Sequence, residues 1–347
     1  MSFVNIDPTD FVVSADSVTA PAWGTNLPIL TQFYTSSTYS NSPTFYVDVY
    51  ASASTDTTPQ FSIAYGHISG SGSQYYNDAV PGYSPTRTTY GQYRTLVYGD
   101  ENTNFNFGTG NNSSQDIFII NVNRSKYKEK LFLSTFNLYL SGSSGSMQLT
   151  NNSVDTSVVN FLDCGRVYNI VSGSNGTTTS STPTQAPGVT AGYTPSGSYG
   201  LYLPDVGLAI LNPRALALPY VSGGIGLTVS SSADTNDQQF LKLYESIRLA
   251  ANPITNKGFQ LNSEETISSD FIFVRVKNSD FNYSTNPSMI SGSGELVYST
   301  LINNPQTYMT TVGLYNDNND LLAVAKLSKP LVKDFTKEAL VRVKLNW

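Results

Sequence analysis

Residues 116–122 have the sequence DIFIINV, a nearly continuous apolar run. A run of this length, rich in β-branched side chains, predicts a strand that is covered on both faces. The segment LFLSTFNLYL at 131–140 predicts a second strand after a short charged connector, and FSIAY at 61–65 alternates as a half-buried strand does. Clusters of Ser, Gly, Asn and Pro separate these runs. Their spacing favours an antiparallel sandwich or barrel over βαβ units.

Strand patterns continue to the end of the chain. Residues 308–315 and 321–327 flank an Asn- and Asp-rich loop at 316–320 and predict a hairpin. The Lys329-Pro330 pair is expected to stop its second strand. Four more strands are predicted at 45–50, 271–277, 295–301 and 339–345.

One helix is predicted near 238–249. Its apolar side chains recur at spacings of three and four and fall on one face: Phe240, Leu243, Tyr244 and Ile247. Asp234 or Thr235 would cap its start, and Asn252-Pro253 would end it.

These patterns predict a mainly β chain of two or more antiparallel β-sandwich or barrel-like domains, with one or two short helices. Residues 172–200 carry almost no large aliphatic side chain and no charge. Such a segment buries too little apolar surface to offset its ordering. We therefore expect a β domain at 1–171, a Gly/Ser/Thr/Pro-rich loop or linker at 172–200, and a second β domain at 201–347 that contains the helix.

The composition favours packing against partners. Charged residues make up 13% of the chain, against about 25% in ordinary soluble domains, and it contains 23 Tyr and 17 Phe. A surface of hydroxyls, amides and phenols suits large permanent interfaces, because few long charged side chains must be desolvated. The net charge of −6 argues against nucleic acid as the main partner.

The single cysteine, Cys164, excludes an intrachain disulfide and fits a reducing compartment. The first residues show no signal-peptide pattern, and no segment has the roughly 20 apolar residues of a membrane span, so no membrane is expected. A secreted or bacterial surface β protein shares much of this composition, but the missing signal pattern counts against it.

Groups that commonly carry catalysis are scarce. His67 is the only histidine, which excludes multi-histidine metal sites and leaves one imidazole for any triad. Residues 222–227 are glycine-rich but lack the lysine of a phosphate-binding loop. Glu264 and Glu265 show no pattern of a glycosidase pair, and Asp317 and Asp320 are explained by the turn. No enzymatic activity, metal, cofactor or small-molecule substrate is therefore expected.

The C-terminal part of the chain resembles a family of virus proteins. Four segments carry the resemblance: 280–288 (DFNYSTNPS), 304–316 (NPQTYMTTVGLYN), 321–331 (LLAVAKLSKPL) and 337–345 (KEALVRVKL). Together they are similar to the C-terminal part of virion structural proteins of large contractile-tailed bacteriophages, including cyanophage-type myoviruses. This resemblance implies a component of the particle that assembles in the host cytoplasm.

We therefore expect a structural subunit of the tail, baseplate or neck, whose partners are other virion structural proteins and copies of itself. The alternative is a receptor- or carbohydrate-binding tail protein, with or without cleavage of the glycan. The interface is expected to include aromatic, aliphatic and basic side chains near the C-terminus: Tyr308, Leu314, Tyr315, Lys333, Lys337, Arg342 and Trp347.

Overall fold

The chain forms two units, and the larger one is a continuous segment inserted into the sequence of the other. The computed structural model describes residues 3–35, 46–53, 58–70, 72, 85–107, 114–179, 198–227, 239–284 and 286–346. The larger unit is Val18–Glu265, and the terminal unit combines Met1–Ser17 with Thr266–Trp347. The chain passes from one unit to the other within β1 (Phe11–Pro21) and again within β16 (Asn262–Val276).

The fold is mainly β with large antiparallel sheets, as the sequence predicts. The large sheet has 13 strands: β2 (Ile29–Leu30), β3 (Tyr34–Thr35), β4 (Tyr46–Tyr50), β5 (Phe61–His67), β6 (Asp116–Val122), β8 (Asn137–Ser141), β9 (Ser146–Asn151), β10 (Asn160–Leu162), β11 (Gly165–Ser174), β12 (Thr177–Thr178), β13 (Gly200–Leu203), β14 (Leu208–Leu211) and β15 (Phe259–Gln260). The second sheet joins β1, β16 and β19 (Ala339–Asn346), with β7 (Lys130–Leu131) beside β16. A separate hairpin pairs β17 (Thr307–Tyr315) with β18 (Leu321–Lys333).

The large sheet must curl on itself. Its strand path runs β2-β15-β8-β9-β11-β13-β14-β6-β5-β4-β3, so β2 and β3 are its two ends. A flat sheet of that width would hold its ends roughly 48 Å apart at the usual strand spacing. Only residues 31–33 separate β2 from β3 in the chain, and this link spans at most roughly 14 Å. The curved sheet encloses the main core of the larger unit.

Both faces of the central strands are covered. On β6, Phe118 and Ile120 belong to the main core, whereas Ile117 and Ile119 belong to a second core on the other face. All residues of β6 except Asn121 are buried. The bounds of this strand and its double coverage confirm the prediction from DIFIINV.

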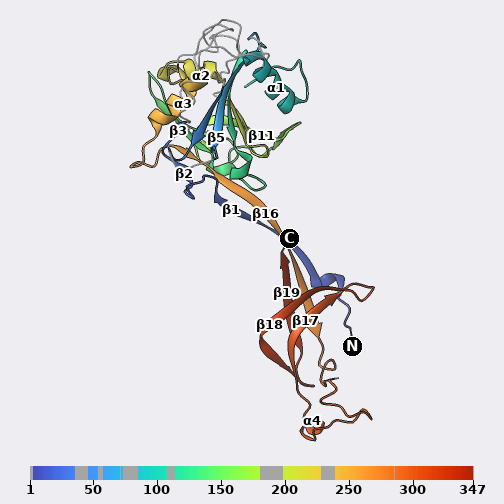
Figure 1. Cartoon of the computed structure of the whole chain (residues 1–347). Helices are drawn as coiled ribbons and strands as arrows, with labels where there is room; N and C mark the ends of the chain where they lie inside the picture. Colours follow the sequence, from blue (N-terminus) through green and yellow to red (C-terminus); the bar gives the residue numbers. More distant parts are fainter. Residues whose placement is uncertain are drawn as a thin grey trace. The chain divides into compact units, whose positions relative to one another are not determined.

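The helices α1 (Thr86–Tyr98) and α3 (Gln239–Ala250) lie on opposite faces of this sheet (Figure 1). The predicted face of α3 packs into the main core through Phe240, Leu243, Tyr244 and Ile247. The predicted caps of α3 lie outside the described residues. Two shorter helices, α2 (Pro213–Ala217) and α4 (Thr300–Asn303), bring the described total to four, where one or two were predicted. Four short 3₁₀ turns complete the described helical segments: Pro8–Asp10, Arg124–Lys126, Leu133–Thr135 and Tyr220–Ser222.

The predicted division at 172–200 does not match the two compact units. Strand β11 ends just inside the start of this segment, and β13 begins at its last residue. The two strands pair with each other, from Tyr168↔Tyr202 to Ile170↔Gly200. Part of the segment is itself strand, because Gly173 and Ser174 pair with β12. Both sides therefore belong to one sheet, and residues 180–197 lie outside the described residues.

Three strand predictions need correction. The predicted strand at 131–140 is broken by the turn Leu133–Thr135, because the chain leaves the pairing of β7 with β16 and enters the large sheet as β8. Residues 295–301 form bends and the start of α4, with one isolated bridge between Ile290 and Leu296, because no strand ladder is available to them. Strand β18 continues past Pro330 because residues 327–330 bulge between the paired Lys326 and Leu331.

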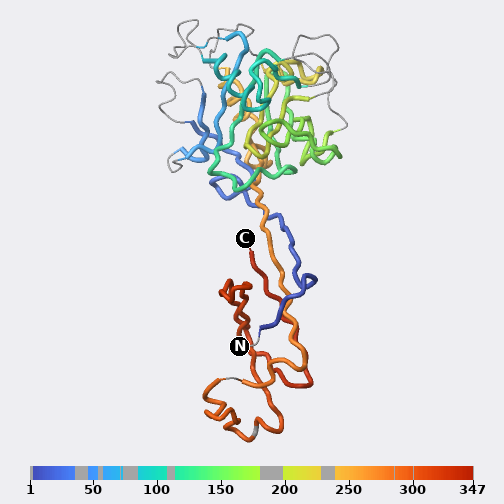
Figure 2. The backbone as a smooth tube through the Cα atoms, turned by 90° about the vertical axis from the view of Figure 1, so that its right-hand side faces the viewer, coloured from blue at the N-terminus to red at the C-terminus, as the bar shows by residue number. Residues whose placement is uncertain are grey.

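The N-terminal segment follows β16 in the smaller sheet. Figure 2 shows this segment, in blue, running beside β16, in orange. Within the terminal unit, the Nε–H of Arg275 on β16 donates to Oδ1 of Asp10 at 2.7 Å. Asp10 is 5% exposed, so the pair fastens the start of β1 to the sheet.

The aromatic cluster at the centre of the main core should dominate the stability of the larger unit. The ring of Phe259 is fully buried, with centroids 4.9 Å from Trp23, 5.3 Å from Phe61 and 5.7 Å from Phe136. Phe259→Ala should lower the free energy of unfolding by about 3–5 kcal/mol, because it removes a large side chain and leaves a cavity. Urea unfolding of the full chain measures this change.

Phe161 provides the matched control, because its side chain on β10 is 70% exposed. Phe161→Ala should change the unfolding free energy by no more than about 0.5 kcal/mol. Equal losses in the two variants would contradict the placement of the core.

Candidate interaction surface

The terminal unit buries little of its own apolar surface. Its core consists of Ile272, Leu314 and Val343 with partly buried neighbours, and its least exposed hydrophobic residue among those described, Val343, is still 5% exposed. The larger unit, by contrast, has many side chains with no exposure at all. Burial of apolar surface is the main favourable contribution to folding, so the terminal unit has little of it to offset chain entropy.

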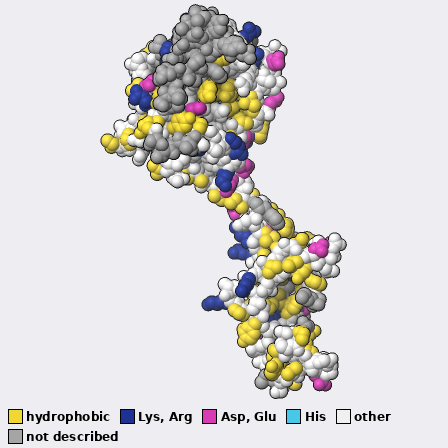
Figure 3. Space-filling view, viewed as in Figure 1, with side chains coloured by type: hydrophobic (Ala, Val, Ile, Leu, Met, Phe, Trp, Pro, Cys, Tyr) yellow, Lys and Arg dark blue, Asp and Glu magenta, His cyan; other side chains and the backbone are white. Residues whose placement is uncertain are grey.

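Large hydrophobic side chains are exposed instead. Among the described residues, nineteen exposed large hydrophobic side chains belong to the terminal unit and twelve to the larger unit, although the larger unit is more than twice as long. Figure 3 shows such side chains, in yellow, on the surface of the terminal unit. Those of the hairpin are Tyr308, Tyr315, Leu321, Leu322, Val324 and Leu331.

The β17–β18 hairpin has one packed face and one bare face. Val312 and Leu314 on β17, with Ala323 and Ala325 on β18, pack into the small core. The side chains that alternate with them, including Val324 at 59% exposure, lie on the bare face. A two-stranded hairpin is marginal in water without further packing, and this one has packing on a single face.

Aromatic rings gather on the bare face. Gly313, which pairs with Val324, has no side chain, and a Cβ there would lie 2.9 Å from Cε2 of Tyr315. The Tyr315 ring therefore folds back over the strand. The ring of Phe3, 52% exposed, makes an edge contact with Tyr315 at a centroid distance of 5.1 Å. We call the exposed residues Phe3, Tyr315, Leu321, Leu322 and Val324 the hairpin patch.

A buried lysine holds the base of the hairpin. The ammonium of Lys333, at the end of β18, donates to the carbonyl oxygens of Asn278 at 3.0 Å and Asp334 at 2.8 Å, and to Oδ1 of Asn282 at 2.6 Å. Lys333 has no exposed surface. Three oxygen acceptors satisfy the three donors of the ammonium, so this charge can remain buried.

An ion pair follows directly along the chain. Nζ of Lys337 lies 3.1 Å from Oδ2 of Asp334. The hydroxyl and backbone N–H of Thr336 donate to the other carboxylate oxygen. The hydrogen bond from the Thr336 hydroxyl, together with Lys337, lowers the pKa of Asp334 to about 2, so this carboxylate is ionised at neutral pH.

The structure separates the predicted interface residues into two groups. Tyr308 and Tyr315 are exposed, Lys337 is half-exposed beside Asp334, and the exposed Arg342 lies over the ring of Phe271 at 5.5 Å. Leu314 and Lys333 are buried within the unit and offer no contact surface, because one fills the small core and the other is enclosed by oxygen atoms. Trp347 lies outside the described residues.

Sequence reasoning missed the N-terminal contribution to this surface. Phe3, Val4 and Ile6 are exposed, as are Phe11 and Val12 at the start of β1. The only sequence signal was the run of apolar residues near the N-terminus, which carries no strand periodicity. Pairing of β1 with β16 brings this run into the same unit as the C-terminal hairpin.

The larger unit contains one buried charged pair that sequence reasoning also missed. Asp116, with no exposed surface, accepts from Nε of Arg214 at 3.2 Å and from the hydroxyl of Tyr65 at 3.2 Å. Burial raises the pKa of Asp116, while the Arg214 guanidinium acts in the opposite direction. His67 pairs with Asp116 across the strands and is 4% exposed, so it is a buried residue of β5. These contacts anchor α2 to the sheet.

The cysteine and the two adjacent glutamates singled out in the sequence lie apart from the Asp116 pair. Cys164 is half-buried and its Sγ lies 3.8 Å from the carbonyl oxygen of Val97. Burial raises the pKa of its thiol, which disfavours the reactive thiolate. Glu264 and Glu265 lie on β16, where Glu265 is 3.6 Å from Lys128. Within the described ranges, no cluster of three His, Cys, Asp or Glu residues is arranged to hold a metal ion.

Comparisons with known proteins add no relative. No protein-family model, no curated protein and no solved structure matches the chain. A search of the described helices for a long apolar segment that could cross a membrane found none.

Replacement of Lys333 tests whether its buried ammonium stabilises the terminal unit. Lys333→Met keeps most of the side-chain volume but leaves three oxygen atoms without their donor, which should destabilise the β16–β19 ladder by about 2 kcal/mol. Amide exchange of β16 and β19 in the full chain should accelerate roughly 30-fold, the factor that corresponds to this energy. Lys329→Met, on the exposed bulge of the same strand, should leave these rates unchanged. The same rates in both variants would mean that the buried ammonium contributes nothing.

Proposed function

We propose that the chain is a structural subunit of a tailed-phage virion, in the tail, baseplate or neck. It acts through permanent protein–protein interfaces formed by its terminal unit, and its partners are other virion proteins and copies of itself. The observation that carries the proposal is the imbalance, among the described residues of the terminal unit, between five buried hydrophobic side chains and nineteen exposed large ones. Contiguous exposed apolar surface is typical of interaction sites.

The character of the hairpin patch supports a lasting interface. Aromatic and aliphatic side chains are the usual anchors of interface cores, and the patch contains two aromatic rings and three aliphatic side chains. Its paired backbone limits the backbone entropy that would be lost on binding. The segments that resemble virion structural proteins fall in this same unit, which supports a place in a phage particle.

The scarcity of catalytic groups supports a role without turnover. The one imidazole is buried beside Asp116, and the thiol is shielded. The carboxylate–guanidinium pair of Asp116 and Arg214 is satisfied by its own contacts. A permanent interface needs none of these groups to react.

Incorporation into particles tests the proposal. Leu322→Asp/Val324→Asp places two charges on the hairpin patch, and the loss of two apolar anchors, worth about 1.5–3 kcal/mol each, should reduce incorporation more than tenfold. Quantitative mass spectrometry of virions purified by density gradient, after complementation with each variant, measures the amount incorporated. The secondary structure of each variant is checked by circular dichroism.

Ile254→Asp is the matched control, because Ile254 is 91% exposed on the larger unit. This variant should enter particles as the unmodified chain does. If the unmodified chain is found in infected-cell lysate but is absent from purified virions, the proposal is wrong. If the charged hairpin variant is incorporated normally, the hairpin patch is not the interface.

A further inference from the structure

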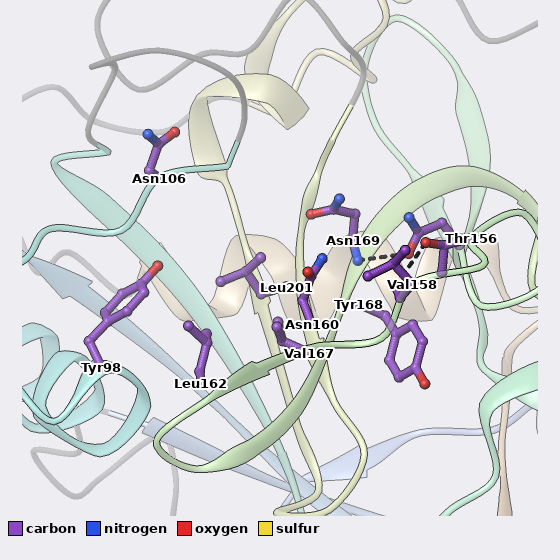
Figure 4. Close-up of a pocket in the computed structure, with 11 residues that line it drawn as sticks. Tyr98, Asn106, Thr156, Val158, Asn160, Leu162, Val167, Tyr168, Asn169 and Leu201 are labelled. Atoms are coloured by element: carbon purple, nitrogen blue, oxygen red, sulfur yellow. Dashed lines mark hydrogen bonds between the residues drawn. The ribbon is translucent and has the colours of Figure 1, made fainter.

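A pocket on the larger unit is lined by asparagine, tyrosine and aliphatic side chains. It lies between the end of α1, the β10–β11 hairpin and β13, with a volume of about 270 Å³. This is near the lower end of the roughly 300–1,000 Å³ typical of small-molecule sites. Figure 4 shows Tyr98 and Asn106 on one side of the pocket and Asn160 and Asn169 on the other.

The floor of the pocket is apolar. Leu201 on β13 belongs to the second core, and Leu162 on β10 and Val167 on β11 pack against that core. All three also line the pocket. The second core therefore reaches the surface here and forms an apolar contact area for a bound ligand.

The walls are made of amides. Four asparagines line the pocket: Asn106, Asn152, Asn160 and Asn169. Asn152 is held firmly, because its Oδ1 accepts from the backbone N–H of Asn169 at 2.9 Å and its own N–H donates to the carbonyl oxygen of Asn169 at 3.0 Å. Within the described chain, the exposed side-chain amides of Asn160 and Asn169 make no hydrogen bond.

None of the described residues that line the pocket is charged. An anionic ligand would call for Arg or Lys, and a metal cation would call for carboxylates. An entirely apolar ligand would leave the amides without partners. A ligand that fits has no net charge, many hydroxyl groups and at least one face of C–H groups.

From this combination we propose that the pocket binds a neutral saccharide. The exposed side-chain amides of Asn160 and Asn169 each offer one acceptor and two donors, which match adjacent hydroxyls of a sugar. The C–H face of the ring rests on Leu162, Val167 and Leu201. The pocket binds without cleavage, because its lining lacks the two carboxylates that hydrolysis of a glycosidic bond requires. The proposal is independent of the hairpin patch and of the function proposed above.

A glycan array tests the ligand class. The full chain is applied to neutral hexose and N-acetylhexosamine oligosaccharides, beside sialylated, sulfated and uronate-containing oligosaccharides. Neutral oligosaccharides should bind and the charged ones should not bind more tightly. Absence of binding to every neutral oligosaccharide, followed by no heat of binding at about 10 mM free sugar, would overturn the proposal. Preference for an acidic glycan would overturn it as well.

Two variants locate the binding. Asn160→Ala/Asn169→Ala removes two exposed amides that make no hydrogen bond within the described chain, so the fold should persist. Calorimetric titration with the tightest-binding neutral oligosaccharide should show at least a tenfold higher Kd than for the unmodified chain. The control, Gln92→Ala, removes an exposed amide on α1 outside the lining and should leave the Kd unchanged. An unchanged Kd in the double variant would show that sugar binds elsewhere and would contradict the proposal.

Discussion

The packing of one hairpin face against β16 and β19 is the interaction on which the terminal unit depends. Val312 and Leu314 meet Ile272 and Val343 there, and the opposite hairpin face meets solvent. Loss of backbone freedom costs roughly 1–2 kcal/mol per residue, and each fully buried aliphatic side chain returns about 1.5–3 kcal/mol. The burial free energy of so small a core therefore offsets only part of the entropy that a unit of this length loses on folding. Coverage of the bare face by another protein, as proposed above, would add the burial that this unit lacks.

The larger unit has the opposite balance. Its sheet is covered on both faces, by a main core that includes α3 and by a second core that includes α1. Its charged pair at Asp116 and its aromatic cluster around Phe259 are satisfied internally. Most of its apolar side chains are therefore buried within the unit itself. One chain thus combines a well-buried β unit with a unit that exposes much of its apolar surface.

Sequence patterns predicted the elements whose burial repeats regularly and missed those that depend on distant parts of the chain. The bounds of β6 and the apolar face of α3 were predicted correctly. Burial on both faces of a strand, or on one face of a helix, produces a regular spacing of apolar residues in the local sequence. Helix α1 was missed because it is rich in Thr and Tyr, which favour strands; packing against β5 and a left-handed C-cap at Gly99 override that preference.

The division into units and the interface could be predicted only in part. The terminal unit combines the first residues of the chain with the last ones, and local sequence patterns do not predict contacts between such distant segments. Lys333 was predicted to be a contact residue, but two of the oxygens that enclose it are backbone carbonyls, which are invisible in the sequence. Tyr308 and Tyr315 are exposed, and their place in an interface stays a prediction.

Amide hydrogen exchange of the β17–β18 ladder, compared between the free chain and intact particles, tests the central claim most directly. If a partner covers the bare face, these amides should exchange at least about 100-fold more slowly in the particle, whereas those of β6 should be slow in both states. Equal exchange of the hairpin in the free chain and the particle would show that the terminal unit completes its own packing, and would contradict the account.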